Sequence, residues 1–303
     1  MVTRGSAAEP LAELNRPEEE HRGLPIPLLI GVILVAYGCA RVLEVTPSPV
    51  PRITIVALDV SFAMAFALVH GARQYRLRGI LVFAFLCLVV GNLSENLGVI
   101  TGFPFGRYYF LDLMGPKLFH VPVLLGLAYI GMAYVSWVLG CLIVGSHSGS
   151  ARGLGVPLVA SLIMVAWDLA QDPVWSTVLH GWVWLDGGPW FGVPISNYFG
   201  WYATDFLIYL LFAFYLRSNP VIARLRNPAW NRSATAFYTC CAAGNVLQIA
   251  RRPDPATVLD PAGHAWSVAD ITRASALVSI FVMGAFAALA WFRLAKQEKL
   301  ATN

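Results

Sequence analysis

Long apolar runs recur along the chain and are separated by shorter stretches that hold glycine, proline or arginine. Each run is close to the roughly 20 residues that an α-helix needs to cross a bilayer. The pattern therefore predicts an all-α fold, a polytopic integral membrane protein with about eight transmembrane helices in one bundle. The runs cover residues 24–43, 53–71, 79–98, 120–144, 155–171, 198–216, 234–250 and 271–293.

The composition supports this prediction. Of the 303 residues, 57% are apolar or aromatic and only 13% are charged, which is too little polar surface to cover a soluble globule. The arginines fall in short clusters between apolar runs, and the net charge is only +4. This arrangement argues against nucleic-acid binding and is typical of membrane-topology signals.

The basic clusters also predict the orientation. They lie at 73–78, 217–232 and 293–299, and with eight spans all three fall on the side that the positive-inside rule makes cytoplasmic. We therefore expect both termini in the cytoplasm and the protein in a bacterial cytoplasmic membrane. Residues 1–23 mix glutamates with arginines and lack the apolar core of a signal peptide, so we expect a disordered cytoplasmic tail before a single transmembrane domain over 24–295.

Five acidic residues lie inside the apolar runs or, for Asp172, directly after one, where a charged group is costly. On insertion scales, a carboxylate near the middle of a membrane helix costs roughly 2.5–3.5 kcal/mol, so several of them indicate a function. Under the expected topology they all fall in the outer half of the membrane, which predicts a single pocket there. They are Asp59, Glu95, Asp168, Asp172 and Asp205, and Asn92, Asn96, His120 and Asn197 fall at a similar depth.

Asp168 and Asp172 are four residues apart, a spacing that puts both carboxylates on one face of a helix. An acid in apolar surroundings tends to stay protonated and can act as a general acid, and a neighbouring carboxylate strengthens this tendency. In a bilayer, the natural substrate for such an acid is an isoprenoid double bond, whose carbocation aromatic rings would stabilise. We assign catalytic roles to Asp168, Asp172 and Glu95.

The side chains expected to bind the substrate are polar and aromatic groups near the same layer. Two linkers, 101–110 and 182–194, are dense in glycine, proline and aromatic rings. Aromatic rings collect at membrane interfaces in any membrane protein, but such loops also suit a lid over a pocket. The substrate-binding candidates are Asn92, Asn197, Asp205, Asp59, Tyr108, Trp167, Trp184 and Trp201.

Each acidic residue also has a purely structural interpretation. Asp168 would then make a helix–helix hydrogen bond, and Asp172, which precedes Pro173, would mark the end of a helix. Asp59 and Asp205 would pair with an arginine or a tyrosine. His120 stands alone and is not interpreted as a ligand.

Several short motifs resemble a known family, the integral-membrane carotenoid-biosynthesis proteins that include CruF-type carotenoid 1,2-hydratases and bisanhydrobacterioruberin hydratase. They are ENLGVITGFPFGRY at 95–108, DLAQDP at 168–173, and WVW, GG, FGVP, Asn197 and GW between 182 and 201. The resemblance covers roughly residues 90–216. It implies a hydro-lyase that adds water to the terminal double bond of an acyclic carotenoid without a cofactor, with Glu95, Asp168, Asp172 and Asn197 as motif positions.

Other functions remain open at this stage. An isoprenoid cyclase or isomerase would use the same acid, and a lipid or ion transporter would use the carboxylates as a proton relay, although the chain lacks an internal repeat. A membrane prenyltransferase would bind magnesium through Asp168 and Asp172, but there is no second D-x-x-x-D motif. We expect no cofactor, no metal and no nucleic-acid partner, and a hydrophobic isoprenoid or carotenoid and membrane lipid as partners.

Overall fold

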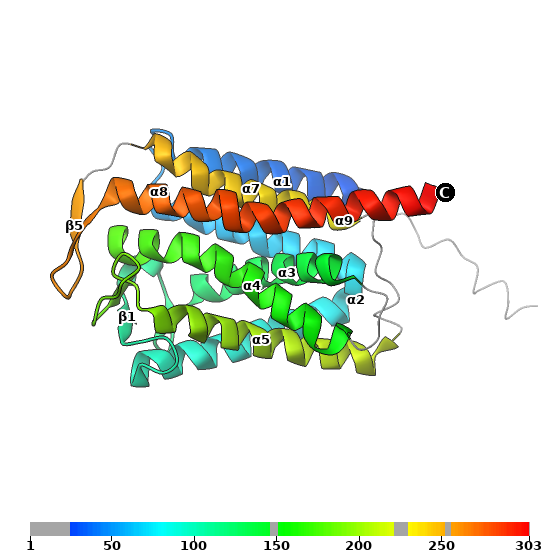
Figure 1. Ribbon diagram of the computed structural model, residues 1–303, viewed down its shortest axis with the longest axis horizontal. Coiled ribbons are helices and arrows are strands. Elements are labelled where there is room, and N and C mark those ends of the chain that lie inside the picture. The colour runs from blue at the N-terminus through cyan, green and yellow to red at the C-terminus, as the bar shows by residue number, and fades with distance from the viewer. Residues whose placement is uncertain (1–24, 146–150, 221–229, 252–255, 303) are drawn as a thin grey trace, which may run out of the picture.

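The computed structural model describes residues 25–145, 151–220, 230–251 and 256–302. Over these ranges the fold is all-α, as the apolar pattern predicts, and the strands are short pieces within the connections (Figure 1). Six of the described helices are long and apolar enough to cross a membrane. The tail expected over 1–23 lies outside the described residues.

The helices are α1 (Ile26–Leu43), α2 (Arg52–Thr101), α3 (Val123–Val144), α4 (Ala151–Pro173), α5 (Ile195–Ser218), α7 (Asn231–Leu247), α8 (Val268–Val278) and α9 (Gly284–Thr302). The π-helical turns are η2 (Val174–Val178) and η5 (Ser279–Met283), and the 3₁₀ turns are η1 (Asp112–Met114) and η4 (Gln248–Ala250). The strands are β1 (Tyr108–Phe110), β2 (Lys117–Leu118), β3 (Val121–Pro122), β4 (Trp182–Trp184), β5 (Thr257–Leu259) and β6 (Ala265–Ser267).

Helix α2 contains two of the expected runs. Its backbone leaves the helical region at Arg76, where φ is 56° and ψ is 165°. A Cβ on Gly71 would overlap Ile80, although nine residues of unbroken helix would separate these positions by about 14 Å. The chain therefore turns back at Arg76, and the two halves of α2 run in opposite directions along the bundle (Figure 1).

Two expected helix boundaries differ in the structure. His120 lies in the turn between β2 and β3 and not at the start of a helix, because Pro122 caps α3, which begins at Val123. Under the purely structural interpretation of Asp172, Pro173 would end its helix, but the chain continues through Pro173 into η2. A π-helical turn widens the helix locally and so accommodates the missing N–H of proline.

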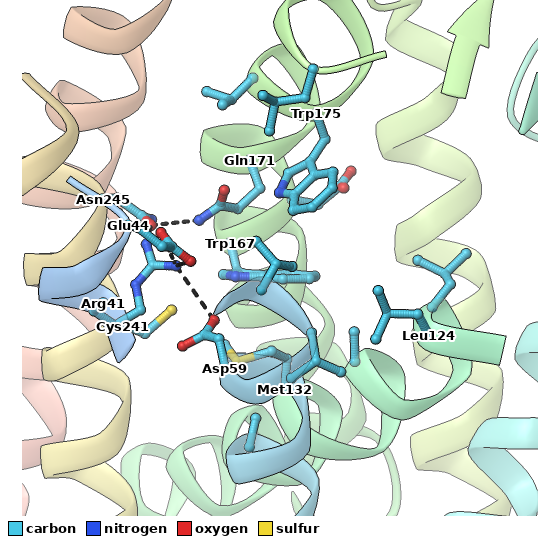
Figure 2. A pocket seen from close by; sticks show the side chains of 18 of the residues that line it. Arg41, Glu44, Asp59, Leu124, Met132, Trp167, Gln171, Trp175, Cys241 and Asn245 are labelled. Carbon is cyan, nitrogen blue, oxygen red and sulfur yellow. Dashed lines mark hydrogen bonds and ion pairs between the residues drawn. The ribbon is translucent and has the colours of Figure 1, made fainter. Parts of the chain in front are cut away.

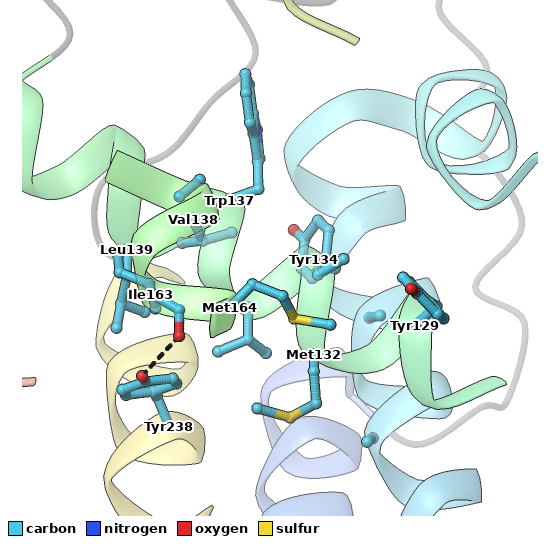
Figure 3. Close-up of a cluster of buried hydrophobic side chains, with 14 of the residues drawn as sticks. Tyr129, Met132, Tyr134, Trp137, Val138, Leu139, Ile163, Met164 and Tyr238 are labelled. Atoms are coloured by element: carbon cyan, nitrogen blue, oxygen red, sulfur yellow. Dashed lines mark hydrogen bonds between the residues drawn. The ribbon is translucent and has the colours of Figure 1, made fainter. Parts of the chain in front are cut away.

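The core is built around α3, which is the most deeply buried of the six long helices. Small residues let its neighbours approach closely, since Gly131 packs on Ala63 and Gly140 packs on Ala160. Large side chains such as Tyr134, Trp137 and Met164 fill the remaining space (Figure 3). On the outside of the bundle apolar side chains lie exposed, among them Phe85, Phe281 and Phe292, as a surface in contact with lipid requires.

The connections at one end of the bundle form a cap. Strand β1 pairs antiparallel with β4, which joins the two linkers 101–110 and 182–194. The hairpin of β5 and β6 lies at the same end, near β1 and β4 (Figure 1). Because α4 and α5 meet this cap directly, their buried carboxyl and amide groups lie below it.

Candidate functional site

Asp168 and Asp172 lie one turn apart on α4 and face the first turn of α5. The side-chain amide of Asn197 donates to both of them, over 3.1 Å to Asp168 Oδ2 and 2.6 Å to Asp172 Oδ2. All three side chains are buried. Pro194 is the N-cap of α5, so Asn197 lies in the first turn of this helix and reaches both aspartates from there. The structure thus holds two carboxyl groups together through one amide.

Asp172 receives two further donors from the cap. The indole N–H groups of Trp182 and Trp184 donate to its Oδ1 over 3.0 and 3.1 Å. Both tryptophans belong to β4, whose pairing with β1 fixes their direction. Asp172 therefore accepts three N–H groups, a set that suits an ionised carboxylate, whereas among the described residues Asp168 accepts only the one from Asn197.

Glu95 approaches the pair from α2 and is buried as well. The hydroxyl groups of Tyr108 and Tyr129 both donate to its carboxylate, Tyr129 over 3.2 Å. Burial, together with the charge of Glu95, raises the pKa of the Tyr108 hydroxyl well above its usual range. Tyr108 therefore keeps its proton and acts as a donor. Asp168 lies close enough to Glu95, Asp172 and Asp205 to interact with them electrostatically.

Two pockets flank the aspartate pair. The larger is lined by Asp168 and has an empty volume of about 1040 Å³, which includes space open to the outside. The smaller is lined by Asp172 and measures about 260 Å³ in the same way. Leu125, Trp182 and Trp201 line both of them, so the two pockets are neighbours. The larger one also has an apolar and aromatic wall formed by Leu124, Leu125, Ala128, Met132, Trp167, Trp175, Trp182 and Trp201 (Figure 2).

A second polar group lines the larger pocket on the side of α1, α2 and α7. Arg41 donates to Glu44 over 3.0 Å, to Asp59 over 3.4 Å and to Asn245 over 2.7 Å. Gln171, on the same helix as the aspartate pair, donates to Asn245 as well. Figure 2 shows this network beside Trp167. The arginine partner considered for Asp59 is therefore Arg41.

The remaining candidates are placed as follows. Tyr108 and Trp184 pack against each other with ring centroids 4.7 Å apart, and Trp201 stacks on Tyr129 at 4.6 Å. Asn92 accepts a hydrogen bond from Asn96 and lines neither of the two pockets. Asp205 is fully buried, and no described side chain or backbone group makes a hydrogen bond with its carboxyl oxygens.

Sequence reasoning missed Arg41, Asn245 and the role of Trp182. Arg41 stands near the end of an apolar run, where an arginine is usually a topology signal, so the residue type alone did not point to a pocket. Asn245 lies in the predicted run 234–250, and only the fold brings it to Gln171. Within the described residues no group of three or more His, Cys, Asp or Glu side chains is arranged to hold a metal ion.

The linkers that cover the site are held in place by close packing. A Cβ on Gly98 or on Gly200 would overlap the ring of Phe105, which therefore sits in a gap between α2 and α5. Outside this contact, an exposed ion pair joins Arg107 to Asp186 across the paired linkers. The cap thus covers the aspartate pair, and its Trp182 and Trp184 contact Asp172 directly.

A bundle of apolar helices with buried acids under an aromatic cap defines a multi-pass membrane protein with an internal site. The family model described as carotenoid biosynthesis protein matches residues 54–259, and the chain belongs to this family. The match includes every expected site residue from Asp59 to Asp205, whereas Arg41 lies outside it.

A curated relative is bisanhydrobacterioruberin hydratase of Haloarcula japonica. It is 27% identical to this chain over 202 residues, a match that covers 66% of each protein. The match therefore spans just under two thirds of the relative's length. No solved structure matches the chain.

Proposed function

We propose that the protein adds water to a terminal carbon–carbon double bond of an acyclic carotenoid or a related isoprenoid. The observation that carries this proposal is the position of Asp168, a buried carboxyl group beside a second carboxyl group on the wall of a large aromatic pocket. The family and the hydratase relative agree with carotenoid chemistry. The reaction is of the hydro-lyase type.

Asp168 acts as the acid. Its proton adds to the less substituted carbon of the double bond, and the electron pair of the π bond forms the new C–H bond. The positive charge that remains on the tertiary carbon faces the rings of Trp167 and Trp201, which line the same pocket, and the negative faces of aromatic rings stabilise a cation. Water then attacks this carbon and loses a proton, which gives a tertiary alcohol.

Asp172 and Glu95 keep Asp168 in its acid form. Asp172 accepts three N–H groups and so holds the negative charge of the pair, and a nearby negative charge favours the proton on its neighbour. Glu95, which lines the smaller pocket together with Asp172, adds to this effect. The same pair of groups is available to orient water.

Expression of the full chain in a lycopene-producing host, followed by mass analysis of the pigments, tests the proposed reaction. Hydration adds the mass of one water molecule for each converted end. A product of unchanged mass but altered chromatographic retention would assign a cyclisation or isomerisation to the same acid. Unchanged lycopene would contradict the proposal.

Removal of metal ions distinguishes hydration from a magnesium-dependent prenyl transfer, in which the substrate is a diphosphate. Acid catalysis by carboxyl groups needs no metal, so activity of the purified protein in detergent should survive EDTA and require no nucleotide. Loss of activity on chelation, followed by restoration with magnesium, would instead support a prenyltransferase with Asp168 and Asp172 as ligands.

A further inference from the structure

We propose that Asp59, held by Arg41, binds the water that attacks the carbocation and accepts its proton. The inference rests on the hydration proposed above and names a second catalytic group for it. The larger pocket has two polar walls, with Asp168 on α4 and with Asp59 and Arg41 on α2 and α1. An acid and a base that share one pocket can act on the same substrate from different sides.

Arg41 is fixed more firmly than a surface arginine. Its side chain is only 7% exposed, and it donates to Glu44, Asp59 and Asn245. It lies across α7 where Gly244 leaves room, since a Cβ there would overlap its Nε. The guanidinium therefore keeps a permanent positive charge 3.4 Å from Asp59 Oδ2, and this charge offsets part of the cost of burying an ionised carboxylate there.

The two oxygens of Asp59 have different surroundings. Oδ2 faces Arg41, whereas Oδ1 is buried and has no hydrogen-bond partner among the described residues. A buried acceptor without a donor is unfavourable, and a hydroxyl group in the pocket would satisfy it. The Asp59 carboxylate lines the pocket and has free acceptor capacity, so it can accept the O–H of a bound water.

Polar side chains lead from this position to the end of the bundle. Glu44, Arg52 and Gln248 line the same pocket as Asp59, and they belong to the ends of α1, α2 and α7 that lie near the cap. Gln248 donates to Glu44 over 2.8 Å. Water needs such partners to cross an otherwise apolar layer, so this wall supplies the nucleophile.

The proposed hydration balances in protons and electrons without any further reactant. Asp168 gives its proton to one alkene carbon and becomes a carboxylate. The water oxygen forms the C–O bond at the tertiary carbon, and one of its protons passes to the Asp59 carboxylate. The alcohol leaves, and a proton returns from Asp59 to Asp168 through water, which restores both groups.

Deuterium exchange distinguishes the role of Asp168 as the acid from the role of Asp59 as the base that binds water. In D₂O, protonation by Asp168 followed by loss of a proton returns the alkene with deuterium, whereas capture of the cation by water gives the alcohol. The full-length protein in proteoliposomes is incubated with lycopene, and both products are measured by mass spectrometry. For Asp59→Asn we expect alcohol formation to fall at least about tenfold, while deuterium still enters unconverted lycopene.

Further variants complete the test. Asp168→Asn should lose both the alcohol and the exchange, and Asp59→Glu should recover part of the alcohol lost in Asp59→Asn. Asp270→Asn, at an exposed ion pair with Arg273, is the control and should match the wild type. If Asp59→Asn does not accumulate, Arg41→Lys replaces it and should shift the products from alcohol to exchange.

The remaining outcomes overturn the inference. Equal loss of alcohol and exchange in Asp59→Asn would assign Asp59 to substrate binding or to the fold, and retention of both would remove it from the reaction. A raised KM confined to substrates that already carry a hydroxyl group would assign the Asp59 site to substrate recognition. If the wild type produces neither alcohol nor exchange, the proposed hydration itself fails.

Discussion

Asp168 and Asp172 lie one turn apart and are equally buried, yet their surroundings differ. Asp172 faces three N–H donors, from Asn197, Trp182 and Trp184, and Asp168 shares only the first of these. A proton on Asp172 would conflict with this ring of donors. The unequal donor set therefore favours Asp168 as the group that carries and releases the proton.

Replacing Asp168 with asparagine tests this assignment. The amide has nearly the same size and still forms hydrogen bonds, but it cannot protonate an alkene. Turnover should therefore fall by about 10²–10⁴-fold or more, the usual contribution of a general acid, while the abundance of folded protein in the membrane stays normal. Pigment analysis and quantification of the membrane fraction measure both effects.

A variant that keeps more than about a tenth of wild-type activity would show that Asp168 is not the acid. Glu95 and then Asp172 would take its place in the same experiment. If Asp168 only joined α4 to α5, its replacement would lower abundance or thermal stability and leave activity in the protein that remains.

At the scale of helices and linkers, the contact between Phe105 and its two glycines holds the cap against α2 and α5. Gly200→Ala would place a methyl group into the ring of Phe105. Because a packed interior accommodates little extra volume, we expect a loss of about 1–3 kcal/mol of stability and weaker activity, as Tyr108 moves away from Glu95. Thermal unfolding in detergent measures the change.

Gly31→Ala is the matched control for this prediction. Gly31 also lies in a long helix, but no heavy atom lies within 4 Å of an added Cβ. Alanine favours a helix over glycine by about 1 kcal/mol, so this variant should be as stable as the wild type or slightly more so. Equal stability of the two variants would show that the position of Phe105 does not hold the cap.

The sequence predicts most of the helices, but it does not predict every contact between them, for physical reasons. Apolar length identified the helices, and the four-residue spacing placed Asp168 and Asp172 on one face. The network of Arg41 and Asn245 could not be predicted, because these residues are 204 positions apart and meet only through helix packing. The π-helical continuation after Pro173 was also missed, since proline usually ends a helix.

At the scale of the whole molecule, the apolar outer surface and the six long helices define a multi-pass integral membrane protein. The turn at Arg76 and the 17-residue α7 decide how many times the chain crosses the bilayer. If both halves of α2 and also α7 span it, the total is even and the two ends lie on the same side. We therefore propose that both termini face the cytoplasm.

Reporter fusions at the N-terminus and after Lys299 test this orientation. A cytoplasmic reporter should be active at both positions, because the basic residues at 73–78 and 293–299 then face inward. A reporter after Leu118, in the connection near the cap, should give the opposite result. Fusions at the two termini that report different sides would mean that one of the segments does not cross the membrane.

The bridge from Asn197 to the two aspartates also bears on how the chain enters the bilayer. During synthesis α4 leaves the ribosome before α5, so Asp168 and Asp172 reach the insertion machinery before their amide partner exists. Each unpartnered carboxylate opposes insertion, by up to the roughly 2.5–3.5 kcal/mol that applies at the centre of a membrane helix. Helices α4 and α5 should therefore move into lipid as a pair, and nascent chains arrested before residue 197 should leave α4 waiting at the translocon.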